Sequence, residues 1–170
     1  MAQIVSPEGL LELRTEWRRD ATRVVLAMGA FDLLHPGHVR LLEQARSLGD
    51  VLVVAVENDA AVRAAAEKEA KGSARATSGR PVIPMAERAE IVAALSAVDF
   101  VTELRSVSAE EWIECFRPDI YVHGGTEPLL MGAAHAAEKA PGTAWDAANI
   151  PLEPGYSTAA LIERIQQLRQ

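Results

Sequence analysis

Short apolar runs alternate with amphipathic stretches along most of the chain. Residues 24–28 and 51–56 are nearly all apolar, which is typical of strands covered on both faces in a parallel sheet. Each run is followed by a stretch with apolar residues at helical spacing, at residues 37–48 and 60–70. This alternation predicts an α/β fold with a Rossmann-like, doubly wound parallel sheet.

The alternation continues, with weaker signals, through the rest of the chain. The pattern predicts helices at about residues 85–97 and 109–116, and strands at 100–103 and 120–122. Residues 126–149 are rich in alanine, and we interpret 128–139 as a weak helix and 149–152 as a strand. Residues 71–80 combine glycine, serine and threonine with basic side chains, which predicts a mobile loop.

Both ends of the chain carry helix signals. Ser6 is a suitable N-cap and Pro7 suits the first helical position, so a helix is predicted from there to residues 18–20. The last helix is predicted to begin at Ser157 or Thr158. The apolar side chains that this last helix should bury are Leu161, Ile165 and Leu168.

Composition and charge narrow the class of protein. Of the 170 residues, 49% are hydrophobic, so the chain can bury a substantial core as one domain with a small appendage. A formal net charge of −7 offers no basic surface for nucleic acid or an anionic membrane. We find neither a membrane-spanning apolar run nor a signal-peptide pattern at the start. Cys115 is the only cysteine, which favours the cytoplasm, and its helical context predicts a buried small apolar residue.

The segment after the first apolar run carries the strongest chemical signal, because ligands of open parallel sheets bind beyond the carboxyl ends of strands. Residues 29–38 read Gly-Ala-Phe-Asp-Leu-Leu-His-Pro-Gly-His. His35 and His38 flank a Pro-Gly pair at the predicted start of a helix, where free N–H groups and the helix dipole attract anions. Imidazoles with pKa values near neutrality can donate further hydrogen bonds, and Gly37 lets a phosphate approach the backbone.

This arrangement suits phosphoryl or nucleotidyl transfer, which depends on positioning and charge stabilisation. The plainer interpretation makes His35 a helix cap and His38 an ordinary surface residue, but the surrounding Gly-x-Phe-Asp pattern disfavours it. A zinc site is a weaker interpretation, since nearby sequence supplies no third ligand. No metal site held by protein side chains is therefore expected.

The motif and its surroundings resemble the cytidylyltransferase-like nucleotidyltransferase superfamily, which is marked by a strand, Gly-x-Phe-Asp-x-x-His-x-Gly-His and a helix. Further similar segments follow in order at residues 49–59, 79–88, 97–101 and 155–158. The series is most similar to the adenylyltransferase half of the enzymes that make ADP-heptose from a heptose 1-phosphate, and it covers essentially the whole chain. The resemblance implies a helical extension, residues 1–22, before a nucleotidyltransferase domain, residues 23–170.

The resemblance also implies a role for each matching residue. Three residues would stabilise charge on the transferring phosphate and are the expected catalytic residues, namely His35, His38 and Arg88. The expected nucleotide-binding residues are Gly29, Ala30, Phe31, Gly37, His123, Gly124, Gly155, Ser157 and Thr158. The expected residues for the acceptor substrate are Asp32, Lys71 and Arg80.

Three departures from the family pattern bear on the substrate. Residues 123–126 read His-Gly-Gly-Thr where the family has a lysine before Gly-Gly-Asp, so a fixed positive charge is replaced and a carboxylate is missing. The segment between Lys71 and Arg80 is longer than in the relatives, and Met28 replaces an asparagine. These differences put the nucleotide base, the turnover and the identity of the acceptor in question.

The resemblance implies transfer of AMP from ATP to a phosphorylated sugar or polyol, with release of pyrophosphate and with Mg²⁺ carried on the nucleotide. It also implies a cytoplasmic homo-oligomer, for which we expect a dimer. Two alternatives stay open at this point. One is a CTP-dependent cytidylyltransferase, or an enzyme acting on a flavin or polyol phosphate, and the other is a non-catalytic nucleotide-binding homologue.

Overall fold

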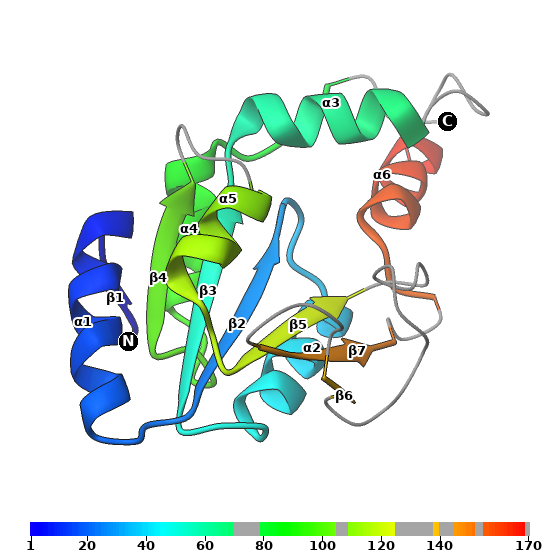
Figure 1. Cartoon of the computed structure of the whole chain (residues 1–170). Helices are drawn as coiled ribbons and strands as arrows, with labels where there is room; N and C mark the ends of the chain where they lie inside the picture. Colours follow the sequence, from blue (N-terminus) through cyan, green and yellow to red (C-terminus); the bar gives the residue numbers. More distant parts are fainter. Residues whose placement is uncertain (70–78, 105–108, 125–137, 140–144, 152–154, 169–170) are drawn as a thin grey trace.

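A twisted sheet with helices on both faces forms the body of the protein (Figure 1). A computed structural model describes residues 1–69, 79–104, 109–124, 138–139, 145–151 and 155–168. The strands are β1 (Gln3–Ile4), β2 (Val24–Gly29), β3 (Val51–Glu57), β4 (Phe100–Leu104), β5 (Ile120–Gly124), β6 (Glu138–Lys139) and β7 (Asp146–Ile150). The helices are α1 (Pro7–Arg19), α2 (Pro36–Arg46), α3 (Asp59–Glu69), α4 (Met85–Ala93), α5 (Ala109–Phe116) and α6 (Thr158–Gln167).

The strand order of the sheet is β1-β4-β3-β2-β5-β7-β6. All neighbouring strands are parallel except β6, which pairs antiparallel with β7 at the edge. From β2 the chain first builds outward through β3 and β4, and then returns to the other side of β2 with β5. The doubly wound parallel sheet is therefore confirmed, and its topological switch point lies between β2 and β5.

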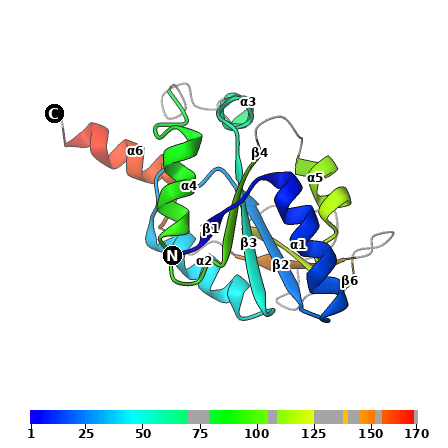
Figure 2. The ribbon, with the colours of Figure 1, turned by 90° about the vertical axis from the view of Figure 1, so that its left-hand side faces the viewer.

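Alternate residues of the central strands face opposite helical layers. Val25 and Ala27 of β2 belong to a buried cluster with Leu42 of α2 and Val92 of α4. Val24, Leu26 and their neighbours on the other face pack with Leu10 of α1 and with α5, in a cluster that includes Trp112 and Phe116. Figure 2 shows the same division, with α2 and α4 on one side of the sheet and α1 and α5 on the other.

Aspartate side chains hold the amino-terminal ends of the central strands. Asp119 accepts a hydrogen bond from the Val24 N–H at 2.7 Å, and Asp99 accepts one from the Leu52 N–H at 2.8 Å. Asp50 accepts a hydrogen bond from the N–H of Arg23 at 2.8 Å. Donors that the ladders would leave unsatisfied are thus paired with carboxylates, which fixes where each strand begins.

Gly49, between α2 and β3, is required by close packing. A Cβ atom there would lie 2.7 Å from both the carbonyl oxygen of Arg23 and a methyl carbon of Val25. Because the carbonyl belongs to the backbone, we expect Gly49→Ala to destabilise the fold by about 1–3 kcal/mol, as overpacking does. Urea unfolding checks this result.

Gly9→Ala is the matched control for that experiment. The closest atom to its added Cβ is a methyl carbon of Val5, at 2.9 Å, which belongs to a side chain that can move. Alanine is also the better helix former within α1. Equal stability of the two variants would contradict the packing explanation.

Several element boundaries differ from the sequence prediction. Helix α4 ends at Ala93 rather than near residue 97, because the chain turns there and the Leu95 N–H bonds the Val92 carbonyl. Residues 138–139 form β6 instead of the end of a helix, and the rest of that predicted helix, 128–137, lies outside the described residues. The last long strand is Asp146–Ile150, earlier than the predicted 149–152. Strand β1 was not predicted, because two residues are too short to show a pattern.

Two predictions about burial are wrong. Ile165 and Leu168 are 52% and 83% exposed, because α6 projects from the body instead of lying on the sheet (Figure 2). Cys115 is exposed rather than buried, on the outer side of α5. Helix α1, in contrast, packs on its own sheet, with the Trp17 ring 5.1 Å from that of Phe100.

Among the described helices, none combines the length and the apolar character that crossing a bilayer requires.

Candidate active site

The turn between β2 and α2 brings two histidines together at a helix start. His35 is the N-cap of α2, and its Nδ1 accepts a hydrogen bond from the His38 N–H at 3.4 Å. The two imidazole rings stack with a centroid distance of 3.8 Å and an interplanar angle of 17°. Because Nδ1 of His35 is an acceptor, its proton is carried on Nε2, which leaves that nitrogen as a donor. The corner thus combines imidazoles with the first N–H groups of α2.

The backbone of this turn is tightly shaped. Phe31 has a positive φ of 47°, which is uncommon for a residue with a side chain, and its ring lies 5.4 Å from that of His38. A Cβ on Gly37 would lie 3.0 Å from Nδ1 of His35 and 3.1 Å from the Cβ of Tyr156. Glycine at position 37 therefore lets the His35 ring and Tyr156 approach the first turn of α2.

Both histidines are neutral at physiological pH in the free protein. Burial, followed by the nearby charges of His35 and Arg80, lowers the pKa of His38 to about 4. Burial also lowers the pKa of His35. Nδ1 of His38 is buried and has no hydrogen-bond partner among the described residues. The expectation of pKa values near neutrality is therefore wrong for His38, which is an uncharged ring with an unused polar atom.

The start of α6 lies beside the start of α2. Gly155 has a φ of +88°, a conformation that glycine adopts readily, and it leads the chain into the helix. Ser157 is the N-cap and accepts a hydrogen bond from the Ala160 N–H at 3.1 Å, while Thr158 is buried. The Tyr156 ring stacks near the His35 ring, with centroids 6.3 Å apart. Two helix N-termini thus meet at one place.

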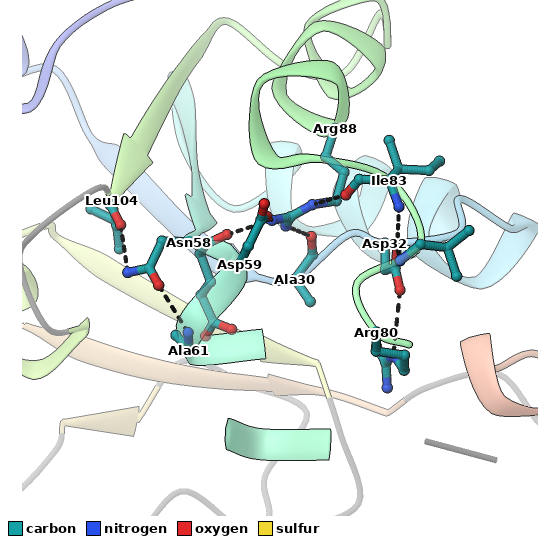
Figure 3. Close-up of polar contacts among 11 residues, drawn as sticks. Ala30, Asp32, Asn58, Asp59, Ala61, Arg80, Ile83, Arg88 and Leu104 are labelled. Carbon is teal, nitrogen blue, oxygen red and sulfur yellow. Dashed lines mark hydrogen bonds and ion pairs between the residues drawn. The ribbon is translucent and has the colours of Figure 1, made fainter. Parts of the chain in front are cut away.

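Arg88 lies inside the protein, where it joins four segments (Figure 3). Its guanidinium donates to the carbonyls of Ala30, Glu57 and Ile83, and to a carboxylate oxygen of Asp59 at 2.6 Å. The side chain has no exposed surface. This position differs from the expected contact with a triphosphate, because the donors are directed at protein oxygens and no face of the group is open.

Asp32 is likewise directed at the protein (Figure 3). One carboxylate oxygen accepts hydrogen bonds from the N–H groups of Val82 and Ile83, at 2.8 and 3.0 Å. The other oxygen pairs with Nε of Arg80 at 3.3 Å, and the Asp32 side chain has no exposed surface. Asp32 and Arg80, both expected at the acceptor, are thus brought together and hold the segment before α4 against the histidine turn.

For several of the remaining expected residues, the structure describes only the backbone or does not describe the residue. Gly29 and Ala30 end β2 and begin the histidine turn, and Gly124 ends β5 on the other side of the switch point. The backbone of His123 pairs with Asn149 of β7, and its side chain is not described. Lys71 lies outside the described residues, as do Gly125 and Thr126.

Two residues near the site were missed by the sequence analysis. Tyr156 contacts the His35 ring and lies under the Arg40 guanidinium, whose carbon is 5.7 Å from the ring centroid. Asp59 is the carboxylate partner of Arg88. Tyr156 lies within residues 155–158, a segment that resembles the nucleotidyltransferase superfamily, so the sequence already pointed to this position. No local pattern indicated the pairing of Asp59, because Arg88 lies 29 residues later in the chain. The N-cap of α3 is Asn58, which accepts a hydrogen bond from the Ala61 N–H.

The described residues do not form a protein-held metal site. No group of three or more histidine, cysteine or acidic side chains comes together in that part of the chain. Near the histidines, the carboxylate of Asp32 is already used by two N–H groups and an arginine.

The chain is similar to known proteins in both sequence and fold. Residues 26–131 match the family described as Cytidylyltransferase-like. The chain is 40% identical to the Bifunctional protein HldE of Koribacter versatilis (strain Ellin345) over 96% of its own length and 31% of that protein. It is 46% identical to the Bifunctional protein HldE of Desulfatibacillum aliphaticivorans over 64% of its length and 20% of that protein.

The chain thus spans about a third, or less, of the length of the curated relatives it matches. Among solved structures, it resembles a lipopolysaccharide core biosynthesis protein from Thermoplasma volcanium GSS1. The TM-score is 0.50 and the identity is 27%, over 64% of this chain and 79% of that chain.

Proposed function

The chain belongs to the cytidylyltransferase-like family, and on that premise we propose that it is a nucleotidyltransferase that moves AMP from ATP to a phosphorylated sugar. An oxygen of the acceptor phosphate attacks the α-phosphorus of ATP. The bond from that phosphorus to the β-phosphate oxygen breaks, and pyrophosphate leaves. The product joins the sugar to adenosine through a diphosphate, made of the acceptor phosphate and the transferred α-phosphate, and no enzyme nucleophile takes part.

The observation that carries the proposal is the pair of stacked, neutral histidines at the start of α2. His38 has an unused buried nitrogen, and the neighbouring helix start supplies N–H groups. Such preorganised donors stabilise the charge that develops on the α-phosphoryl group and on the leaving pyrophosphate. The second helix start, at Ser157 and Thr158, is suited to the outer phosphates of the nucleotide.

In this proposal, Arg88 and Asp32 do not touch the substrate. They hold the backbone around the histidine turn through hydrogen bonds inside the protein. Arg88 fixes the Ala30 carbonyl relative to the ends of β3 and the segment before α4. Asp32 fixes the same segment through two N–H groups. Together they hold the histidine turn in one geometry. A fixed geometry is required because the enzyme forms no covalent intermediate and acts by positioning and charge stabilisation.

Mg²⁺ enters bound to the phosphates of ATP, as part of the substrate. The single cysteine fits a cytoplasmic location.

We propose a homodimer in which α6 takes part, since its Ile165 and Leu168 side chains are exposed. Sedimentation of the intact chain distinguishes dimer from monomer.

Pyrophosphate release tests the reaction. ATP and CTP are each supplied with Mg²⁺ and a panel of sugar 1-phosphates and polyol phosphates. We expect release with ATP and a sugar phosphate, and a product whose mass is that of AMP plus the sugar phosphate minus one water. Release with CTP alone would overturn the choice of base, and nucleotide binding with no release across the panel would indicate a non-catalytic homologue.

Nucleotide binding should be linked to proton uptake. A polyanion stabilises the protonated imidazole, so binding raises the pKa of His38 above its free value of about 4. Protons are therefore taken up between the free and bound pKa values, and the affinity rises as the pH falls through that interval. Calorimetry with a non-hydrolysable ATP analogue at pH 6, in buffers of different ionisation enthalpy, measures the uptake.

The His38→Gln variant separates this effect from protonation of the nucleotide itself. It should take up fewer protons than the unmodified chain under the same conditions. Identical uptake by both proteins would contradict the assignment of His38 as a phosphate ligand.

A further inference from the structure

A polar cleft lies at the amino-terminal ends of the central strands, whereas the histidines follow the carboxyl-terminal end of β2. Its volume is about 520 Å³, and it opens to solvent between the end of α1 and the starts of β2, β5 and β7. Three arginines and two aspartates line it, namely Arg14, Arg18, Arg23, Asp119 and Asp146. The six residues of β2 lie between the cleft and the histidine turn, and a strand of that length spans roughly 20 Å. The cleft is therefore distinct from the candidate active site.

Arg14 is the buried member of this cluster. Its side chain is 5% exposed, and it donates to the Arg117 carbonyl through Nε and Nη2, at 3.0 and 2.9 Å. Nη2 also pairs with Asp119 at 3.1 Å. The third nitrogen, Nη1, is buried and has no hydrogen-bond partner among the described residues. A buried donor without an acceptor costs about 1–3 kcal/mol, so the fold keeps the Arg14 guanidinium beside the cleft at a cost in stability.

The charges around the cleft also favour an anionic ligand. Burial lowers the pKa of Arg14, and the charge of Arg18 adds to this effect. Asp119 is already used by Arg14 and by the Val24 N–H. Arg18 donates to the carbonyls of Phe116 and Arg117, both at 3.3 Å, and within the described residues no carboxylate pairs with it or with Arg23. The lining therefore carries one more positive than negative side chain, in a chain whose net charge is −7.

We propose that this cleft binds the phosphate group of a small phosphorylated compound. The guanidinium groups of Arg18 and Arg23 are the donors for its oxygens, and the buried guanidinium of Arg14 adds positive charge behind them. Planar guanidinium forks match the oxygens of a phosphate, and the arginines outnumber the aspartates in the lining. Asp146, on the same rim, accepts a hydrogen bond from a hydroxyl group of the compound. The competing explanation is purely structural, with Arg14 and Arg18 only capping the carbonyls that end α5.

Inorganic phosphate is the probe, and ¹H-¹⁵N spectra of the full chain are the readout. Phosphate should shift the backbone amide signals of Thr22 and Arg23, with or without a saturating non-hydrolysable ATP analogue. Acetate, which carries a single charge, should shift them at least tenfold less at equal concentration. The double variant Arg18→Gln, Arg23→Gln should bind phosphate at this place at least tenfold more weakly.

The double variant Arg19→Gln, Arg63→Gln is the matched control, because it removes the same charge from exposed positions outside the cleft. It should bind phosphate like the unmodified chain. Equal weakening in both double variants, or shifts confined to residues 35–38, would overturn the proposal. Because the cleft signals are followed separately from those of the histidine turn, a failure here is distinguishable from a failure of nucleotide binding.

Discussion

Replacing His38 by alanine should lower the rate of pyrophosphate release by a factor of about 100 or more, the size of effect seen when one charge-stabilising donor is removed. The ring stacks on His35 and contacts Phe31, and its unused nitrogen is buried at the start of α2. The loss should fall mainly on kcat, because charge develops during transfer. Steady-state kinetics with ATP and the best acceptor from the panel measure it.

Glu43→Ala is the control for this variant. Glu43 is an exposed residue of the same helix, so its replacement tests for a general disturbance of α2. Its kinetics should match those of the unmodified chain, and thermal unfolding should show both variants folded. Turnover by His38→Ala within a few-fold of the unmodified rate would remove His38 from the mechanism.

Replacing Arg88 by methionine should destabilise the fold by about 3–5 kcal/mol, because each part-buried acceptor that loses its donor costs about 1–3 kcal/mol. The change leaves the carboxylate of Asp59 and the carbonyls of Ala30, Glu57 and Ile83 without their donor. A domain of this size has only about 5–15 kcal/mol of stability, so much of it would be lost. Urea unfolding measures the free energy.

Two further variants show whether Arg88 acts through the fold or at the substrate. Arg63→Met makes the same replacement on the exposed side of α3 and should leave stability within about 0.5 kcal/mol. Arg88→Lys keeps the charge but not the planar set of donors, and should be clearly destabilised. If Arg88→Lys unfolds like the unmodified chain yet loses turnover, Arg88 contacts the triphosphate and its assignment as a positioning residue is wrong.

The main helices and strands could be predicted from the sequence because each carries its own pattern. The runs at residues 24–28 and 51–56 are apolar throughout, and they became the buried strands β2 and β3. The histidine turn was equally visible, since all its polar groups lie within ten consecutive residues. Local information of this kind fixes both the elements and the corner that joins them.

The surroundings of single side chains could not be predicted in the same way. Arg88 is bonded to residues 29 and 58 positions away along the chain, so its spacing in α4 gave no sign of full burial. Asp32 similarly meets the segment 50 residues later. For α6, the apolar spacing of Leu161, Ile165 and Leu168 correctly indicated a helix, but spacing does not say whether a partner surface exists within the chain.

Titrating the chain with a non-hydrolysable ATP analogue, with the imidazole nitrogens followed by ¹⁵N NMR, tests most directly whether the histidine turn receives the polyphosphate. We predict that the ring nitrogens of His35 and His38 and the amide signals of Gly37 and His38 shift together and saturate at one analogue per chain. Binding that leaves these signals unchanged would contradict the account.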